Sequence, residues 1–338
     1  MTDHFVARAP GRVNLIGDHT DYTGGLVLPM AIDRWTVVEG SIHDGPIDLV
    51  SDDQPLPVSL TLPVTDPEAV EPPWGRYVAG VAAEMGAKAH SIRGHVSTTI
   101  PVGAGLSSSA ALELACALAL GFQGNAIELA QLGRRAEHRA SGVPCGIMDQ
   151  LCIAAGIAGH ALLIDCNELT IEPLKLIDGV TVVVQFVTRR ALVGSAYADR
   201  VGECAAAEQR IGPLRLATTQ DVARIDHPII RRRAHHVVTE NQRVRDFAQV
   251  MRDGDPVTAG RLMVESHNSL RDNFATSNPT MDRAVAQMCA IPGVYGARMT
   301  GGGFGGCIVA ITKPGTVCQG WVVQAVDGAS IKIQGVPH

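Results

Sequence analysis

The sequence predicts a protein of the α+β class that folds as two lobes. Its 338 residues correspond to about two domains, since a domain usually holds roughly 150 residues. Strand-like and helix-like segments are segregated in both halves of the chain, without a regular alternation of strand and helix. A doubly wound parallel sheet requires that alternation, so the pattern favours separate layers of strands and helices.

The first part of the chain is expected to be rich in strands and then to become helical. Its apolar segments are β-branched or alternate with polar residues, and prolines from Pro55 to Pro73 predict a loop-rich passage. The expected strands are Phe5–Ala9, Thr36–Glu39 and Ile92–Ile100. The expected helices are Ser107–Leu120, a helix capped by Asn125 that runs to about Ser141, and Gly146–Ala155.

The second half is expected to run from strands through helices and back to strands. The first strands are Ala161–Asp165 and Val180–Phe186. The helices that follow are expected near Ser195–Arg210, Pro228–Arg252, Val257–Asn273 and Met281–Cys289. The last elements are strands Tyr295–Met299, Cys307–Ile311 and Ser330–Gln334, with a helix near Pro314–Val326. We expect one lobe to comprise residues 1–165 and the other residues 166–338.

Composition excludes several classes of protein. The net charge is -6, and no concentrated basic stripe of the kind that nucleic-acid binding needs is present. No stretch approaches the ~20 apolar residues of a membrane span, and the first ten residues lack a secretory signal. The eight cysteines form no C-x-x-C pair, which is typical of buried thiols in a reducing compartment. We therefore expect a cytoplasmic monomer that binds neither nucleic acid nor a membrane.

A glycine- and serine-rich segment, PVGAGLSSSA, lies between an expected strand and an expected helix at residues 101–110. Glycines let the backbone approach an anion closely, serines offer hydrogen-bond donors, and a helix N-terminus adds unpaired N–H groups. Phosphate is the natural ligand of such a segment. A purely structural turn would have the same appearance. No lysine follows as in a P-loop, and the dinucleotide pattern G-x-G-x-x-G is absent.

The segment GRVNLIGDHTDY, residues 11–22, combines one fixed cation with several acceptors. The side chains in question are Arg12, Asp18, His19 and Asp21. This set suits a polyhydroxylated ligand beside a charged reaction centre. A surface loop with scattered charges would have a similar composition, so both interpretations stay open.

Two further segments contain unusual residues. Asp149 is the only acid in the apolar segment from Cys145 to Cys152, where a carboxylate must be paired or used chemically. It is therefore either a buried hydrogen-bonding strut or a catalytic acid or base. The segment from Arg298 to Cys307 has five glycines in six positions, which suits either a tight turn or close packing against a nucleotide loop.

Taken together, these segments resemble the signatures of galactokinases. Residues 11–22 resemble G-R-V-N-L-I-G-E-H-T-D-Y, residues 103–109 the G-x-G-L-S-S-S phosphate loop, and residues 300–306 the T-G-G-G-F-G-G segment. CGIMDQ at 145–150 and L-V-G-S-x-Y at 192–197 are also similar, so the resemblance extends from about residue 5 to residue 312. The wider group includes homoserine, mevalonate and phosphomevalonate kinases, whose nucleotide site is not a P-loop.

The resemblance implies two α+β lobes of the galactokinase and mevalonate kinase type, with the active site in the cleft between them. It also implies ATP, Mg²⁺ and galactose as ligands, and phosphorylation of the C1 hydroxyl of α-D-galactose. By position, Asp149 matches the catalytic base and Arg12 the transition-state cation, while Ser109 and Glu137 match the Mg²⁺ ligands. The expected sugar-binding residues are Asp18, His19, Thr20, Asp21 and Tyr197. The expected phosphate-loop residues are Gly103, Ala104, Gly105, Leu106, Ser107, Ser108 and Ser109.

Two positions depart from the family pattern. Asp18 stands where the signature usually has Glu, which shortens a carboxylate expected to contact the far end of the sugar, and Val201 stands where arginine is common. Asp18 motivates a second hypothesis, a kinase of a galactose analogue such as an N-acetylated, deoxy or uronic sugar. A third hypothesis is a non-catalytic galactose sensor, which the intact serines at 107–109 and the intact Asp149 disfavour.

Overall fold

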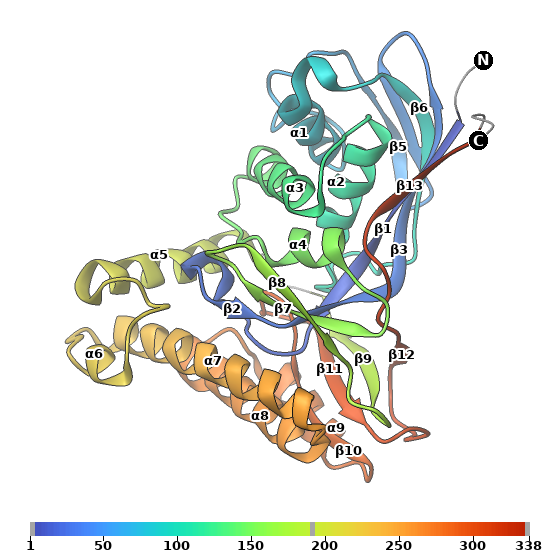
Figure 1. The fold of residues 1–338 in the computed structure, drawn as a ribbon. Helices are drawn as coiled ribbons and strands as arrows, with labels where there is room; N and C mark the ends of the chain where they lie inside the picture. The colour runs from blue at the N-terminus through green and yellow to red at the C-terminus, as the bar shows by residue number, and fades with distance from the viewer. Residues whose placement is uncertain (1–3, 190–192, 335–338) are drawn as a thin grey trace.

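The first lobe is built on a six-stranded sheet at the upper right of Figure 1. The computed structural model describes residues 4–189 and 193–334. In spatial order the strands of this sheet are β13 (Ser330–Gln334), β1 (His4–Asn14), β3 (Pro29–Ile42), β6 (Ile92–Thr98), β4 (Ile47–Ser51) and β5 (Gln54–Leu60). Neighbouring strands are antiparallel, except that β4 and β6 are parallel.

Helices pack on one side of this sheet (Figure 1). They are α1 (Gly75–Met85), followed by the short turn η2 (Gly86–Lys88), α2 (Ser108–Ala119), α3 (Ala126–Ser141) and α4 (Met148–Ala155). Helices α2 and α4 contact β1 and β3, while α1 and α3 pack against each other and against α2. The expected cap of α3 is confirmed, because the Asn125 side chain accepts the N–H groups of Ile127 and Glu128.

The second lobe is built on an antiparallel sheet of four strands in the described residues. In spatial order they are β10 (Val294–Met299), β11 (Gly306–Thr312), β9 (Thr181–Thr188) and β12 (Trp321–Val323). Its helical segments are α5 (Val193–Ile211), α6 (Thr219–Ala223), α7 (Pro228–Asp253), α8 (Pro256–Ser269), the π-helical turn η3 (Leu270–Phe274) and α9 (Pro279–Cys289). Helices α7, α8 and α9 each begin with proline, whose missing N–H costs nothing at that position.

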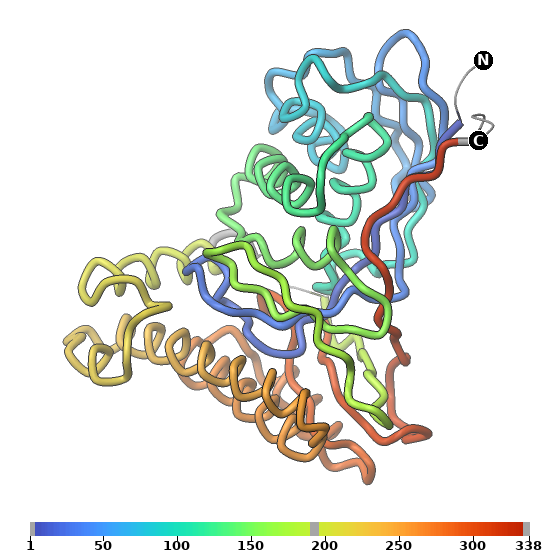
Figure 2. Tube along the Cα trace, in the orientation of Figure 1, coloured from blue at the N-terminus to red at the C-terminus, as the bar shows by residue number. Residues whose placement is uncertain are grey.

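A small sheet and the end of the chain join the two lobes. The sheet consists of β2 (Leu26–Val27), β7 (His160–Asp165) and β8 (Thr170–Lys175), and it contacts both β3 and α7. Figure 2 shows the last part of the described chain running from the second lobe back to the first strand, where β13 pairs with β1. The division of the chain between residues 165 and 166 stays a prediction, and residues 330–334 of the second range lie in the sheet of the first lobe.

The predicted helix near Pro314–Val326 is wrong. This segment contains a turn, bends and one short strand, since Trp321–Val323 pairs with β9 as β12. The β-branched residues Val322 and Val323 favour a strand, and Gly320 adopts a positive φ of 113° that would end a helix. The hairpin of β4 and β5 was missed because Pro55 and Pro57 suggested a loop. β5 tolerates both prolines because it is an edge strand.

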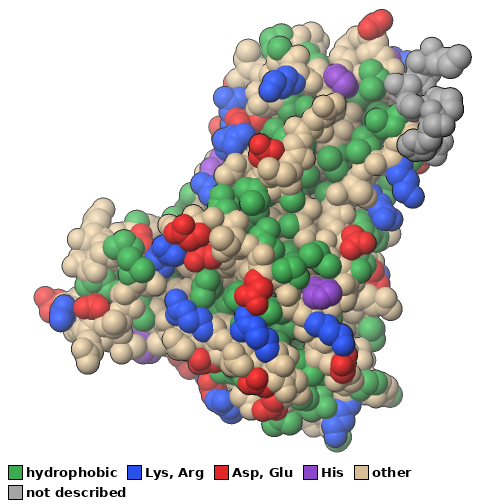
Figure 3. All heavy atoms as spheres, in the orientation of Figure 1, with side chains coloured by type: hydrophobic (Ala, Val, Ile, Leu, Met, Phe, Trp, Pro, Cys, Tyr) green, Lys and Arg blue, Asp and Glu red, His purple; other side chains and the backbone are tan. Residues whose placement is uncertain are grey.

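Three observations on the described residues bear on the compositional analysis. In the part of the chain that the structure describes, no helix has the length and apolarity needed to cross a membrane. On the face drawn in Figure 3, basic and acidic side chains are interspersed, and no continuous basic stripe is visible there. The eight cysteines are free thiols, and most of them are buried.

Candidate active site

Arg12 is fixed where β1 passes beneath the glycine–serine loop, which we define as residues 101–109. A Cβ atom on Gly11 would lie 2.9 Å from the carbonyl oxygen of Leu106, so the loop can pack directly on the strand only because this residue is glycine. The backbone N–H of Arg12 donates to the Leu106 carbonyl at 3.1 Å, and its Nη1 donates to the Gly105 carbonyl at 2.6 Å. Strand and loop therefore hold the guanidinium from two sides.

Ser107 lies at the point where the glycine–serine loop enters α2. It adopts a left-handed conformation, with φ 62°, which is unfavourable for a residue other than glycine and is typical of functional sites. Its hydroxyl does not cap the helix but donates to the carboxylate of Asp149. The N-terminus of α2 thus has no side-chain cap, which leaves its N–H groups available to an anion.

Asp149 and Arg12 form a two-pronged ion pair. Arg12 Nε donates to Oδ1 of Asp149 and Nη2 donates to Oδ2, both at 2.6 Å. Asp149 lies in the first turn of α4, where the helix dipole favours a negative charge. Burial lowers the pKa of Arg12, but the charge and hydrogen bonds of Asp149, together with the charge of Asp18, outweigh burial and raise this pKa above its usual value. The arginine side chain is 4% exposed and the aspartate side chain 29%, so the carboxylate is the accessible partner.

A second carboxylate, Glu137 of α3, lies beside this pair. Ser109 Oγ donates to one of its oxygens at 3.1 Å, and Gln150 Nε2 donates to the other at 2.7 Å. Burial, and then the negative charge of Asp149, raise the pKa of Glu137. Glu113, on α2, is also buried, and burial followed by the charge of Glu137 raises its pKa well above the usual value. These acids therefore lose their protons less readily than exposed carboxyl groups do.

The residues at this position fit a magnesium ion that arrives with a nucleotide. Ser109 and Glu137 bring a hydroxyl and a carboxylate oxygen together, and Mg²⁺ usually takes one or two protein oxygens and completes its shell with phosphates and water. A divalent cation bound there would favour the charged form of Glu137. The described residues contain no cluster of three or more His, Cys, Asp and Glu side chains that could hold a metal by themselves.

The loop between β1 and β2, residues 15–25, is called the sugar-loop candidate below. Asp21 lies in this loop, close to α4. A Cβ atom on Gly146 would lie 1.8 Å from Oδ2 of Asp21, so the approach of this carboxylate requires glycine at position 146. Burial, and then the charge of Asp149, raise the pKa of Asp21 to about 7. Asp21 is therefore a carboxyl group that changes its charge near neutral pH.

His19 is held in an aromatic cluster to which both lobes contribute. Its ring centroid lies 4.7 Å from that of Phe274, in η3, and 5.6 Å from that of Tyr197, on α5. Its Nδ1 lies 3.1 Å from the hydroxyl of Tyr22, and its φ of 66° is left-handed. Burial, followed by the charge of Asp21, raises the pKa of Tyr197 well above its usual value, so this phenol stays a hydrogen-bond donor.

Asp18 borders the same region but is held differently. Its side chain is 1% exposed, and its carboxylate forms an ion pair with Arg298 of β10 at 2.6 Å. It also accepts hydrogen bonds from Asn14 Nδ2 at 3.0 Å and from the backbone N–H of Gly301 at 3.2 Å. The carboxylate is therefore directed toward the protein.

Most of the expected site residues line one cavity of about 480 Å³ between the two lobes, the central cavity. Those that line it are Arg12, Asp18, His19, Asp21, Gly103, Gly105, Ser107, Ser108, Ser109, Glu137, Asp149 and Tyr197. The motif at 192–197 is only partly described, because residue 192 lies outside the described ranges.

Thr20, Ala104 and Leu106 do not line the central cavity. All three are buried, and the hydroxyl of Thr20 donates to the backbone carbonyls of Gly17 at 2.9 Å and Leu26 at 2.7 Å. Thr20 therefore holds the sugar-loop candidate in shape. Ala104 and Leu106 belong to the core beneath the glycine–serine loop.

One end of the central cavity was missed by the sequence analysis. It is lined by Trp74, Tyr77, Val96 and Leu112, by Val102 of the glycine–serine loop, and by Ser51, Asp53 and Gln54 near the tip of the β4–β5 hairpin. Trp74 is fixed by its Nε1, which donates to the Leu56 carbonyl at 2.9 Å. These residues come from separate elements with no common spacing. Gln150 and Gly301, by contrast, lie inside motifs that the sequence already identified.

Family models match three parts of the chain. The galactokinase galactose-binding signature matches residues 2–42, the N-terminal domain of GHMP kinases matches residues 76–156, and the C-terminal domain of GHMP kinases matches residues 247–317. The first covers Arg12 and the sugar-loop candidate, and the second covers the glycine–serine loop, Glu137 and Asp149.

Individual proteins are similar over nearly the whole chain. The galactokinase of Chloroflexus aggregans is 42% identical, over 97% of this chain and 88% of its own length. The human galactokinase is 39% identical, over 96% of this chain and 91% of its own. The crystal structure of Lactococcus lactis galactokinase complexed with galactose superposes with a TM-score of 0.88 at 28% identity, covering 97% of this chain and 95% of that one. Methanococcus jannaschii mevalonate kinase shares the fold, with a TM-score of 0.66 at 21% identity over 92% of this chain and 91% of its own.

Proposed function

The chain belongs to the galactokinase family, and from this premise we propose that it transfers the γ-phosphoryl group of ATP to the C1 hydroxyl of α-D-galactose, giving galactose 1-phosphate and ADP. The observation that carries the proposal is the position of the Arg12–Asp149 pair. The accessible carboxylate of this pair lies in the central cavity between the glycine–serine loop and the sugar-loop candidate. A base placed between a phosphate site and a sugar site is what transfer to a sugar hydroxyl requires.

We assign the phosphates of ATP to the glycine–serine loop. The uncapped N-terminus of α2 offers N–H groups and the positive end of the helix dipole, and Ser108 lines the cavity there. The aromatic and apolar end of the cavity, with Trp74 and Tyr77, suits the flat apolar surface of the adenine base. ATP then lies with its γ-phosphate toward Asp149.

Asp149 acts as the base for the C1 hydroxyl. Its carboxylate accepts the hydroxyl proton as the oxygen attacks phosphorus, and the two hydrogen bonds from Arg12 hold the carboxylate in place. Arg12 is the fixed cation nearest to the transferring group, where it offsets the charge that spreads over the phosphoryl oxygens. Ser109 and Glu137 would hold Mg²⁺, which when bound neutralises charge on the nucleotide phosphates.

The sugar is held by groups of the sugar-loop candidate and α5. Asp21, in its charged form, accepts hydrogen bonds from ring hydroxyls, and the Tyr197 phenol and the His19 ring complete the wall of the cavity. Because α5 belongs to the second lobe, binding of the sugar requires both lobes. The cavity thus orders a hydroxyl, a base and a phosphoryl group in line.

A coupled ADP-release assay across a panel of hexoses tests this function. With ATP and Mg²⁺ we expect turnover with galactose to exceed turnover with glucose or mannose by at least about tenfold. Glucose and mannose differ from galactose in the orientation of ring hydroxyls, and a misplaced hydroxyl leaves a buried acceptor unpaired. A rate with galactose no higher than the sugar-free ATPase background contradicts the proposal. A preferred hexose other than galactose contradicts the sugar assignment.

A further inference from the structure

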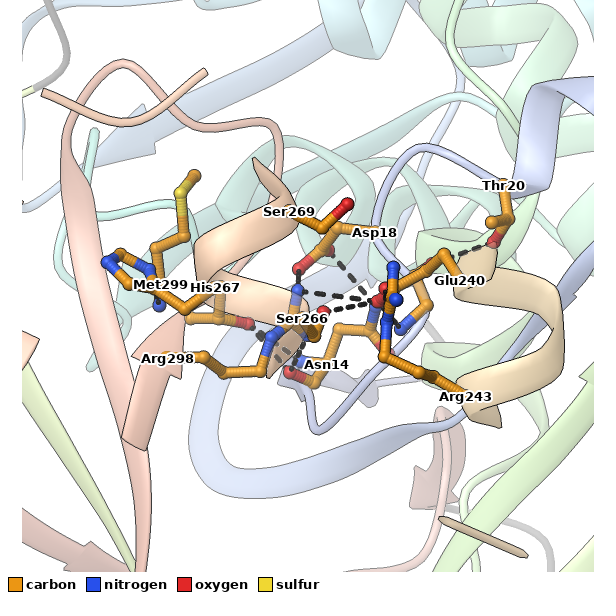
Figure 4. A network of polar contacts seen from close by, with 12 residues as sticks. Asn14, Asp18, Thr20, Glu240, Arg243, Ser266, His267, Ser269, Arg298 and Met299 are labelled. Atoms are coloured by element: carbon orange, nitrogen blue, oxygen red, sulfur yellow. Dashed lines mark hydrogen bonds and ion pairs between the residues drawn. The ribbon is translucent and has the colours of Figure 1, made fainter. Parts of the chain in front are cut away.

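Behind the sugar-loop candidate lies a closed cluster of charged side chains, drawn in Figure 4. Asp18 comes from the sugar-loop candidate, Arg298 from β10 and Glu240 from α7, so the cluster joins elements of both lobes. Arg298 and Glu240 have no exposed side-chain surface, and Asp18 has 1%. We refer to this group, together with Asn14 and Arg243, as the closed cluster.

The carboxylate of Asp18 is almost fully used by protein donors. Its Oδ2 accepts from Arg298 Nη2 at 2.6 Å, and its Oδ1 accepts from Asn14 Nδ2 and from the N–H of Gly301. A carboxylate has about four lone-pair positions, and these contacts occupy most of them. With three protein donors on the carboxylate and only 1% of the side chain exposed, almost no surface of Asp18 is left for a sugar hydroxyl.

Arg298 depends on Asp18 for its neutralisation. The other carboxylate near it, Glu240, lies 3.9 Å from Arg298 Nη2 and is already bound by Arg243 Nε at 2.7 Å. Glu240 also accepts from the N–H of Gly17 at 3.0 Å and from Ser266 Oγ. If Asp18 turned toward a sugar, Arg298 would keep a buried charge without a close partner, which is strongly unfavourable.

The backbone of Asp18 is held as well. Its carbonyl lies 3.1 Å from Nε2 of His236 on α7, and Nδ1 of the same ring lies 2.9 Å from Ser269 Oγ. Burial lowers the pKa of His236 to about 4, so this ring is neutral near pH 7. Side chain and main chain of Asp18 are thus both fixed to the second lobe, one residue before His19.

We propose that Asp18 is a positioning residue, which fixes the sugar-loop candidate to the second lobe through Arg298, and that it does not read the C6 hydroxyl of the sugar. The inference rests on the proposed function and narrows its substrate class. The shorter Asp, in place of the usual Glu, directs the carboxylate into the closed cluster. The enzyme then accepts galactose and 6-deoxygalactose with similar efficiency.

The first test compares kcat/KM for galactose and 6-deoxygalactose in the wild-type protein and in Asp18→Asn. An unpaired buried acceptor costs about 1–3 kcal/mol, so a residue that reads C6 would favour galactose by roughly 5- to 150-fold. We expect a wild-type ratio below about fivefold, and the same ratio in Asp18→Asn while KM for both sugars rises by a common factor. A wild-type ratio of about fivefold or more overturns the proposal, and so does a ratio that changes in Asp18→Asn.

The second test measures thermal unfolding and needs no activity. Asp18→Asn and Arg298→Met should each lower Tm by roughly 5 °C or more, and the double variant should lose clearly less than the sum, because it leaves no unpaired buried charge. Asp48→Asn is the matched control, since Asp48 pairs with exposed Arg93 at 3.4 Å, and it should leave Tm almost unchanged. Additive losses, or an unchanged Tm in Asp18→Asn, overturn the positioning role.

These tests separate failure of the inference from failure of the proposed function. Absence of galactose-dependent ADP release from the wild-type protein contradicts the proposed function, while the unfolding measurements still decide the role of Asp18. If Arg298→Met does not fold, Asp18→Asn with its Asp48→Asn control decides the result alone.

Discussion

Two arginine–aspartate pairs in this protein have the same closest distance but differ in how far a ligand can reach the carboxylate. Arg12 and Asp149 approach to 2.6 Å, and so do Arg298 and Asp18. Both arginines are buried, but the carboxylate of Asp149 is 29% exposed toward the central cavity, whereas that of Asp18 is 1% exposed. We therefore propose that access of a ligand to the carboxylate, rather than the distance within the pair, separates the catalytic pair from the architectural one.

The surroundings of the two pairs explain this difference. Asp149 has two acidic neighbours, Glu137 and Glu113, whose pKa values are raised, so a nucleotide-bound cation would favour their charged forms. The closed cluster has as many close cations as acids, since Arg298 and Arg243 face Asp18 and Glu240. A cluster in which each carboxylate already has a cationic partner needs no ligand, whereas carboxyl groups without one favour the binding of a cation.

The largest expected effect comes from a substitution in the Arg12–Asp149 pair, which we call the open pair because its carboxylate is exposed to the central cavity. Asp149→Asn should lower kcat by about 100-fold or more, because the amide is nearly isosteric but cannot accept the C1 proton. Its Tm should fall less than that of Asp18→Asn, since water in the cavity can solvate the exposed amide. Single-turnover assays and circular dichroism measure the two quantities. If the variant keeps more than about a tenth of the wild-type kcat, Asp149 is not the base.

The sequence identified both aspartates but could not tell their roles apart. Arg12, Asp149 and Glu137 were found because each lies in or beside a motif, and these residues line one cavity. The partner of Asp18 was missed, because Arg298 lies 280 residues further along the chain and the two meet only through the packing of β10 against the sugar-loop candidate. The local periodicity of the sequence does not predict contacts between residues so far apart in the chain.

The fold was predictable where local signals are strong. The capping residue Asn125 predicted the start of α3, and alternating segments predicted β1 and β6. The helix near Pro314–Val326 failed because the pairing of Trp321–Val323 with β9 is a long-range contact that overrides local propensity. Trp74 and Tyr77 likewise reach the cavity by tertiary packing alone, so no motif could have marked them.

The next effect concerns Glu137, which lies beside the open pair. Glu137→Ala should raise the Mg²⁺ concentration for half-maximal rate by about tenfold or more, since Ser109 and the phosphates would hold the ion without the carboxylate. Rates measured against Mg²⁺ at fixed ATP give this value. Glu84→Ala is a matched control, because Glu84 contacts α3 through Arg135 at 2.6 Å and does not line the cavity. An unchanged Mg²⁺ dependence would make Glu137 a structural residue.

The smallest effect is a pH dependence of KM for galactose, which we expect from Asp21 in the central cavity and not from the closed cluster. Asp21 has its pKa raised to about 7, so it is charged above pH 7 and protonated below it. KM for galactose should then rise roughly tenfold between pH 8 and pH 6, as the acceptor is lost. Glu240, in the closed cluster, has its pKa lowered to about 2 by Arg243 and other neighbours despite its burial, and it keeps its charge throughout this range.

The same titration affects stability in a defined direction. The folded state binds a proton on Asp21 up to about pH 7, while the unfolded carboxyl loses its proton near 3.8. The contribution of Asp21 to the free energy of unfolding therefore falls as the pH rises from about 4 to 7, since the folded state binds more protons there. Asp21→Asn should remove both the KM dependence and this slope. A KM that stays constant from pH 8 to 6 in the wild-type protein would contradict the role of Asp21.

Phosphorus NMR of the reaction products tests the central claim most directly, namely that the open pair serves transfer to the anomeric hydroxyl of galactose. The protein is incubated with ATP, Mg²⁺ and galactose, and the position of the new phosphate is read from its coupling to the sugar protons. The account predicts one new signal, that of galactose 1-phosphate in the α configuration, in an amount equal to the ADP formed. A phosphate on any other hydroxyl, or inorganic phosphate alone, would contradict it.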